Sequence, residues 1–174
     1  EIKALSYKDG SVYDTINVTV KDKIEYPSVS DGTVIYVSAT GNDANNGTGA
    51  DQSVKTFSKA LELLAAADSS KEKVIRVSGT VGISGVTLNQ SIIIEGCDSD
   101  STITTHSLTL HASLELRNIC FNVDDFLNTE GYAFTVGDNV RTAKHINMHS
   151  GKKNADGSRE HVTINSGSFN IQSG

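Results

Sequence analysis

The fold is decided by the stretch YVSATGNDANNGTG (residues 36–49), which is followed shortly by VKTFSKAL (residues 54–61). The first stretch is a short apolar strand that runs into a cluster of Gly, Asn and Asp, residue types that favour turns. From residue 54 to residue 67, apolar side chains recur at helical spacing, which predicts one amphipathic helix. Short β-rich segments separated by Gly, Asn and Ser follow that helix. This order is typical of a parallel β-helix whose open end is covered by a helix.

Apolar triplets, which begin and end on an apolar residue, recur in the second half of the chain. They begin at Ile92, Leu114 and Phe134, which are 22 and 20 residues apart. A recurrence of this length indicates a solenoid in which each coil contributes one strand to each face. An antiparallel sandwich is the main alternative, but the chain lacks two-residue hairpin turns. We therefore expect an all-β fold, a parallel β-helix with an N-terminal capping α-helix.

The predicted helix has a structural role. The end of a β-helix exposes unpaired strand edges and apolar side chains, which invite association with other edges. Phe57, Leu61 and Leu64 share the apolar side of the helix. We expect these three side chains to cover the first coil.

Residues 1–24 precede the solenoid. Strands are predicted at residues 2–7 and 15–20, on either side of a polar turn. The pattern resembles the last hairpin of bacterial immunoglobulin-like surface repeats, which commonly end in "ykDGsv…tvnVtV". We expect three parts: this hairpin over residues 1–24, a linker over 25–33, and a capped β-helix over 34–174 that continues beyond the last residue.

Residues 34–121 resemble the N-terminal part of the pectate-lyase-like superfamily, whose members are right-handed parallel β-helices. Extracellular bacterial members often begin with "yVsptGsDsnnGts…pfkTlqkAl", and this chain carries YVS, GND, NNGT and KTFSKAL in that order. The segments SIIIEG and LELRNICF are similar to the family's coils "siiIeG" and "leLrNitf". The chain departs from the family at Ser53 and Val54, where a Pro-Phe pair is usual. The resemblance implies a right-handed β-helix.

Charge and hydropathy exclude two classes of partner. The net charge is −6 and the cationic residues are scattered, so we expect no nucleic-acid binding. No run approaches the roughly 18 apolar residues of a membrane span, so we expect no membrane insertion. Cys97 and Cys120 lie 23 residues apart, close to the length of one coil. This spacing allows either a buried pair of reduced thiols or a disulfide between neighbouring coils.

One loop carries candidate metal ligands. Asp43, Asn45 and Asp51 offer the hard oxygen atoms that Ca²⁺ prefers, so they form a candidate Ca²⁺ site. Turn formation without any ion explains the same residue types, and we give that alternative more weight. The bidentate Glu that ends an EF-hand loop is absent.

Three arginines are candidate carbohydrate ligands. Arg76, Arg117 and Arg141 fall on or beside successive predicted strands, so they could line a sugar-binding groove. Solvent-facing strand positions are the alternative, and we prefer it. Asp124 and Asp125 form the one adjacent carboxylate pair of the coil region, which a solvated turn explains. We assign no catalytic residue.

Two functions remain open. The first is a non-catalytic, adhesin-like module on a bacterial surface that contacts a polysaccharide or host glycan, secreted or attached to the cell wall. The second is the N-terminal part of a polysaccharide lyase or glycosidase, acting on acidic or host polysaccharides through coils further downstream. We favour the first because the combined Asn-Thr-Asp, Asp-Asp, Gly-His-Gly and Arg-X-Lys motifs of glycosidases on this fold are not found together. We also expect self-association through an exposed C-terminal coil.

Overall fold

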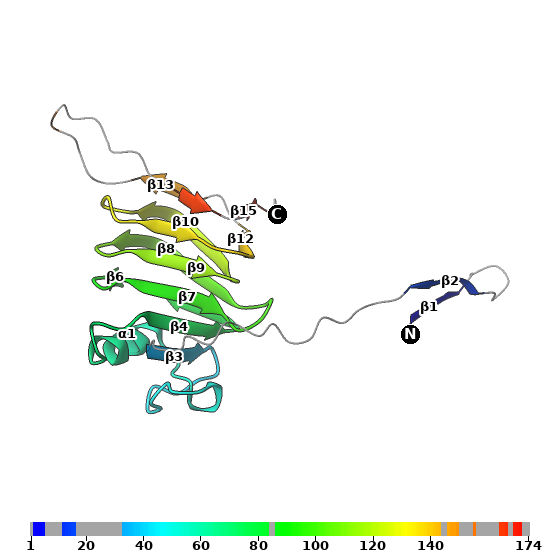
Figure 1. Ribbon diagram of the computed structural model, residues 1–174, viewed down its shortest axis with the longest axis horizontal. Helices are drawn as coiled ribbons and strands as arrows, with labels where there is room; N and C mark the ends of the chain where they lie inside the picture. The colour runs from blue at the N-terminus through cyan, green and yellow to red at the C-terminus, as the bar shows by residue number, and fades with distance from the viewer. Residues whose placement is uncertain are drawn as a thin grey trace.

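The computed structural model describes the backbone of residues 2–5, 12–16, 33–83, 86–143, 146–149, 155, 164–166 and 169–171. From residue 33 on, the strands form two parallel sheets that stack coil upon coil, with one short helix at the N-terminal side (Figure 1). The all-β parallel β-helix predicted from the sequence is therefore confirmed.

Each coil adds strands to sheet B and then to sheet C. Sheet B contains, in spatial order, β3 (Thr33–Ser38), β4 (Lys73–Ser78), β7 (Ile92–Gly96), β9 (Leu114–Arg117), β11 (Phe134–Val136) and β14 (Ile164–Ser166). Sheet C contains β5 (Thr80–Ile83), β6 (Thr87–Leu88), β8 (Thr102–Leu110), β10 (Cys120–Asn128), β12 (Val140–Thr142), β13 (Asn147–His149) and β15 (Phe169–Ile171). The long strands β8 and β10 pair with each other on both sides of a bulge, so one coil presents two consecutive stretches in sheet C.

The spacing of the apolar triplets in the sequence corresponds to the register of the strands in sheet B. Ile92 pairs with Leu114, and Leu114 pairs with Phe134, all in parallel ladders. The offset between β3 and β4 is longer, because Thr33 pairs with Lys73 and the intervening residues form the loop and the helix. The repeat of 20 to 22 residues predicted from the sequence therefore corresponds to one coil of the solenoid.

The core is a set of vertical side-chain columns between the two sheets. Along sheet B, one inward position holds the column Ile35, Ile75, Ile94, Leu116 and Val136, each in register with the next and each buried. Strand residues alternate between the two faces of a sheet. A β-branched or leucine side chain at this position thus contacts its counterparts in the coils on either side.

The turn from sheet B to sheet C depends on close backbone contact between coils. Asn118 follows β9 with a left-handed φ of 46°, and its Nδ2 donates to the Gly96 carbonyl at 3.1 Å. A Cβ on Gly96 would lie 2.2 Å from the Asn118 carbonyl oxygen. Glycine is therefore required where these two turns stack.

The loop before the helix satisfies the free edge of sheet B. The Tyr36 N–H donates to the Gly47 carbonyl at 2.8 Å, and the Ser38 N–H donates to the Val54 carbonyl at 2.9 Å. The Val54 N–H returns a bond to the Tyr36 carbonyl at 2.9 Å. The edge that a parallel β-helix leaves unpaired at its first strand is thus bonded by this loop.

The helix is shorter than the sequence predicts. α1 spans Phe57–Ala65 rather than residues 54–67, and the Thr56 side chain accepts a bond from the Lys59 N–H as its N-cap. Val54 lies outside the helix because its backbone forms a bridge with Val37. Phe57 and Leu64 are buried in the core, and Leu61 packs against it partly buried. No helix among the described residues is long and apolar enough to span a membrane.

The N-terminal segment forms an antiparallel pair, β1 (Ile2–Leu5) with β2 (Val12–Ile16). The second strand begins three residues earlier than predicted, because Val12 finds a partner opposite Leu5. Residues 17–24, and with them the rest of the predicted strand, lie outside the described part of the chain.

The sequence left open the state of the two cysteines and the role of the C-terminal coil. Cys97 and Cys120 are thiols, each partly buried, and no disulfide joins them. The side chains of β14 and β15 lie outside the described residues, so self-association through that coil stays a prediction.

Replacing Leu64 with Ala tests the covering role of α1. The Leu64 side chain is 0% exposed, so the truncation leaves a cavity under the helix and should lower the free energy of unfolding by about 2–4 kcal/mol. Chemical denaturation followed by circular dichroism measures the change. Glu62→Ala on the exposed side of the same helix is the control and should change it by less than about 0.5 kcal/mol. Equal effects of the two substitutions would contradict the packing of α1 on the core.

Candidate functional site

The outer face of sheet B brings polar side chains from successive coils into register. Residues that alternate with the inward column point away from the core. These outward residues form two rows. One row contains Ile93, Glu115 and Thr135. The next row contains Tyr36, Arg76, Glu95 and Arg117. Each row runs along the stacking axis, so neighbouring side chains come from residues about one coil apart in the sequence.

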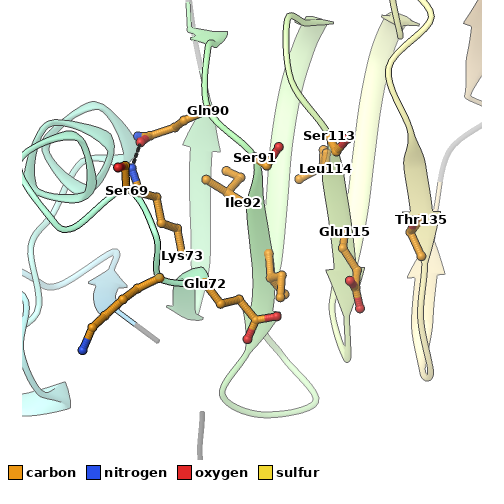
Figure 2. A pocket seen from close by; sticks show the side chains of 12 residues that line it. Ser69, Glu72, Lys73, Gln90, Ser91, Ile92, Ser113, Leu114, Glu115 and Thr135 are labelled. Atoms are coloured by element: carbon orange, nitrogen blue, oxygen red, sulfur yellow. Dashed lines mark hydrogen bonds between the residues drawn. The ribbon is translucent and has the colours of Figure 1, made fainter. Parts of the chain in front are cut away.

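A groove of about 490 Å³ lies on this face. Its lining comes from the segment between α1 and β4 and from the N-terminal ends of β7, β9 and β11 (Figure 2). The lining residues are Ser69, Lys71, Glu72, Lys73, Gln90, Ser91, Ile92, Ile93, Ser113, Leu114, Glu115 and Thr135. Hydroxyl, carboxylate, ammonium and carboxamide groups thus surround an aliphatic floor, a mixture suited to a ligand that is rich in hydroxyls and partly apolar.

One wall of the groove is held by a side-chain bridge. Lys73 Nζ donates to Gln90 Oε1 at 2.7 Å, which Figure 2 shows as a dashed line. Gln90 Nε2 in turn donates to the Leu61 carbonyl of α1 at 3.2 Å. The helix, β4 and the approach to β7 are therefore tied together beside the groove.

Arg76 and Glu95 form a buried ion pair beside the groove. Arg76 Nε lies 2.9 Å from Glu95 Oε2, and Nη1 donates to the Tyr36 hydroxyl at 3.1 Å. The guanidinium also lies 5.8 Å from the centre of the Tyr36 ring. Glu95 is only 3% exposed, although it points away from the core. Burial lowers the pKa of Arg76, but its bonds to Tyr36 and Glu95 outweigh this and raise it. Arg76 is therefore a structural counter-ion.

Arg117 is bound more loosely on the neighbouring strand. Its Nε donates to Glu115 Oε1 at 2.6 Å, and this bond raises the pKa of Arg117. Its side chain lies over Gly137 of the next coil, where a Cβ would come within 3.3 Å of Arg117 Cγ. Both residues of the pair are about one-third exposed, so the pair lies at the surface of this face.

The structure brings two of the three predicted arginines together. Arg76 and Arg117 both pair in register with Glu95 and share the outer face of sheet B. Arg141 lies on β12 of sheet C, where its guanidinium donates to the Ser99 carbonyl. The proposed role of these residues in sugar binding stays a prediction.

Asp43 is used to hold the loop against the helix. Its Oδ1 accepts from the backbone N–H groups of Lys55 and Thr56, both at 2.8 Å, and its Oδ2 accepts from the Thr56 hydroxyl at 2.9 Å. The Thr56 N–H in particular keeps the pKa of Asp43 below its ordinary value. This carboxylate therefore supports the residue that caps α1.

The other two candidate ligands of Ca²⁺ are Asn45 and Asp51. Asn45 Nδ2 donates to the Ser53 carbonyl at 2.9 Å, and Asp51 lies exposed in η1 (Ala50–Gln52). Over the described residues, no group of three or more His, Cys, Asp or Glu side chains could hold a metal. The Ca²⁺ site stays a prediction, while turn and capping bonds account for Asp43 and Asn45.

Asp124 and Asp125 occupy a bulge in β10. The register with β8 shifts between Val123 and Phe126, so these two residues lie opposite the single residue His106. Asp125 Oδ2 lies 4.0 Å from His106 Nε2, and the two side chains are 54% and 81% exposed. Exposure of this degree is typical of a solvated corner, as the sequence predicted for the carboxylate pair.

The comparisons with known proteins add no relative. No family model matches this chain, and neither a curated protein nor a solved structure does so. What the chain does must therefore be argued from the geometry of its own side chains.

Sequence reasoning missed the residues that line the groove. Ser91 and Glu115 lie in segments that the sequence analysis compared with family coils, but nothing marked them, or Ser113 and Thr135, as lining a site. The available signal was the spacing of the apolar triplets, because the residues beside Ile92, Leu114 and Phe134 must also stack in register.

Asp43→Ala separates capping from metal binding. Losing a carboxylate that accepts three bonds should cost about 1–2 kcal/mol at neutral pH, equally in Ca²⁺ and in chelator. Because the folded-state pKa is depressed, this contribution is present above the unfolded-state pKa and is lost as the pH falls through the folded-state pKa. Chemical denaturation from pH 7 downward should show wild type and variant converging in acid. Asp51→Ala is the control, and a cost of Asp43→Ala that appears only with Ca²⁺ would support the metal site.

A double-mutant cycle on Arg76 and Glu95 tests the buried pair. Arg76→Ala leaves the Glu95 carboxylate buried without this partner, so we expect a loss of about 2–4 kcal/mol in the free energy of unfolding. The double variant Arg76→Ala with Glu95→Gln should lose clearly less than the sum of the single losses. Arg117→Ala should cost less than about 1 kcal/mol because its pair is partly exposed. Additive losses at Arg76 and Glu95 would contradict the pairing.

Proposed function

We propose that this chain is a non-catalytic, glycan-contacting module of the bacterial cell surface, and that the groove on the outer face of sheet B is its binding site. The observation that carries the proposal is the lining of that groove by polar side chains from successive coils around an aliphatic floor. Hydroxyl-rich ligands with apolar ring faces match such a lining.

The direction of the groove favours a polymer. Its lining residues on β7, β9 and β11 lie in register, with Ile93, Glu115 and Thr135 in one row. Neighbouring strands are separated by about 4.8 Å, so equivalent positions repeat along the stacking axis. A ligand with a repeating unit can therefore contact one coil after another, which a compact small molecule cannot do.

The charges of this face favour binding over chemistry. Glu95 is held by Arg76, and Glu115 is held by Arg117, so two of its carboxylates already have cationic partners. The motif sets of glycosidases on this fold are also not found together in the sequence. A site built from paired charges and hydroxyls can orient sugars without cleaving them.

Two features of the sequence and the fold support a location on the bacterial surface. The strand, turn-rich loop and helix that resemble the start of pectate-lyase-like β-helices coincide with β3, the loop bonded to it and α1. The antiparallel pair of β1 and β2 is compatible with the end of an immunoglobulin-like repeat. Together these features support a secreted or wall-attached, adhesin-like protein.

Filling the groove tests the proposal. Polygalacturonate, a neutral galactan and mucin glycans are immobilised, and binding of the full chain is measured by biolayer interferometry. Thr135→Trp places a large side chain in the groove and should weaken binding to the preferred glycan more than tenfold. Thr104→Trp is the matched control, because Thr104 occupies an outward position on sheet C and is similarly half-buried.

Two results would overturn this function. Binding to none of the three glycans would rule out glycans as the ligand class. Equal weakening of binding by both tryptophan variants would rule out the groove as the binding site. Release of unsaturated sugars, followed by ultraviolet absorbance, would instead support a polysaccharide lyase.

A further inference from the structure

Tyr132 is an exposed aromatic side chain next to the groove. Among the large hydrophobic side chains of the described residues, it is the one that stands exposed, at 46%. It lies in the connection from β10 to β11. An aromatic ring in water is a candidate contact for a ligand.

The turn that carries Tyr132 is closed by a hydrogen bond and contains a strained residue. The Tyr132 N–H donates to the Thr129 carbonyl at 2.8 Å, which closes the turn around Glu130 and Gly131. These two central residues have φ angles of 49° and 81°, and such a conformation is costly for a glutamate. Asn128 offsets the cost, because its Nδ2 donates to Glu130 Oε1 at 2.6 Å. The ring is thus carried on a turn that one backbone bond and one side-chain bond hold together.

The register places this turn at one end of the groove. Tyr132 precedes the lining residue Thr135 by three positions, and β11 pairs with β9, which supplies Glu115. At about 3.3 Å per extended residue, the Cα atoms of Tyr132 and Thr135 lie within about 10 Å of each other. One ligand can therefore contact the ring and the polar lining together.

The charges near this end disfavour an acidic ligand. Glu130 is in the turn itself, Glu115 lies in the groove, and Arg117 is bonded to Glu115. The two lysines of the lining, Lys71 and Lys73, belong to β4 and the segment before it, and β7 and β9 separate β4 from β11. Carboxylates accept hydrogen bonds from sugar hydroxyls, whereas they repel the carboxylate of a uronic acid.

We infer that Tyr132 is a stacking platform for a neutral pyranose ring, whose hydroxyls are bonded at the Thr135 end of the groove. This inference rests on the proposed function and specifies its ligand. The C–H face of a pyranose carries partial positive charge and packs against the negative face of the tyrosine ring.

Saturation-transfer NMR on the full chain tests the inference. The probes are methyl β-D-glucopyranoside, whose ring faces carry axial C–H groups, and methyl β-D-glucuronide, which differs by a carboxylate at the exocyclic carbon. Saturation should reach the axial ring protons of the neutral glycoside in wild type and in Tyr132→Phe. Tyr132→Ala should weaken binding roughly three- to tenfold, as expected for the loss of one aromatic contact. His106→Ala removes an exposed ring from sheet C and should leave the binding of the neutral glycoside unchanged.

The outcomes separate this inference from the proposed function. Unchanged binding of the neutral glycoside by Tyr132→Ala, with polymer binding still blocked by Thr135→Trp, would overturn the stacking role and leave the groove intact. Equal or tighter binding of the glucuronide would overturn the preference for a neutral ring. Absence of saturation transfer and of polymer binding in wild type would overturn both proposals.

Discussion

Backbone hydrogen bonding between parallel strands is the constraint on which this structure depends. A single coil buries almost nothing, because its apolar side chains need the coil above and the coil below to exclude water. The column from Ile35 to Val136 exists only because each strand of sheet B is bonded in register to the next. Such stacking always leaves a first strand with one unpaired edge.

The segment between β3 and β4 resolves this problem in two ways. Its backbone bonds the free edge through Gly47 and Val54, and its helix covers the end of the core with Phe57 and Leu64. Asp43 links the two parts, since it accepts bonds from Lys55 and Thr56 just before the helix begins. The loop that carries the candidate Ca²⁺ ligands therefore also takes part in closing the solenoid.

The same stacking creates the outer face of sheet B. Once the inward column is in register, the outward residues must also align, and side chains about one coil apart become neighbours. The Arg76 and Glu95 pair consolidates this face, while the groove beside it keeps hydroxyls and carboxylates at one end of the strands. The proposed binding of a glycan, and of a neutral pyranose at Tyr132, uses positions that the core does not need.

Much of the fold could be predicted because buried positions require apolar residues, which then recur at regular spacing in the sequence. The triplets at Ile92, Leu114 and Phe134 predicted the register of sheet B, and helical spacing predicted α1 within three residues at its start and two at its end. The start was misplaced because Val54 is apolar in either role, and pairing with Val37 took precedence over the helix. The strand pair near the N-terminus shifted for a similar reason, since a strand begins where it finds a partner.

The candidate site was far less visible in the sequence. Outward residues face water and carry no hydrophobic period, so nothing marked Ser113, Glu115 or Thr135 as neighbours of the segment after α1. Arg141 looked equivalent to Arg76 and Arg117, but it lies on the other sheet. The sequence by itself determined that apolar strands stack and that a helix covers their end, because burial constrains residue type. The tertiary structure alone decided which polar side chains meet, because register within a sheet is set by the whole coil.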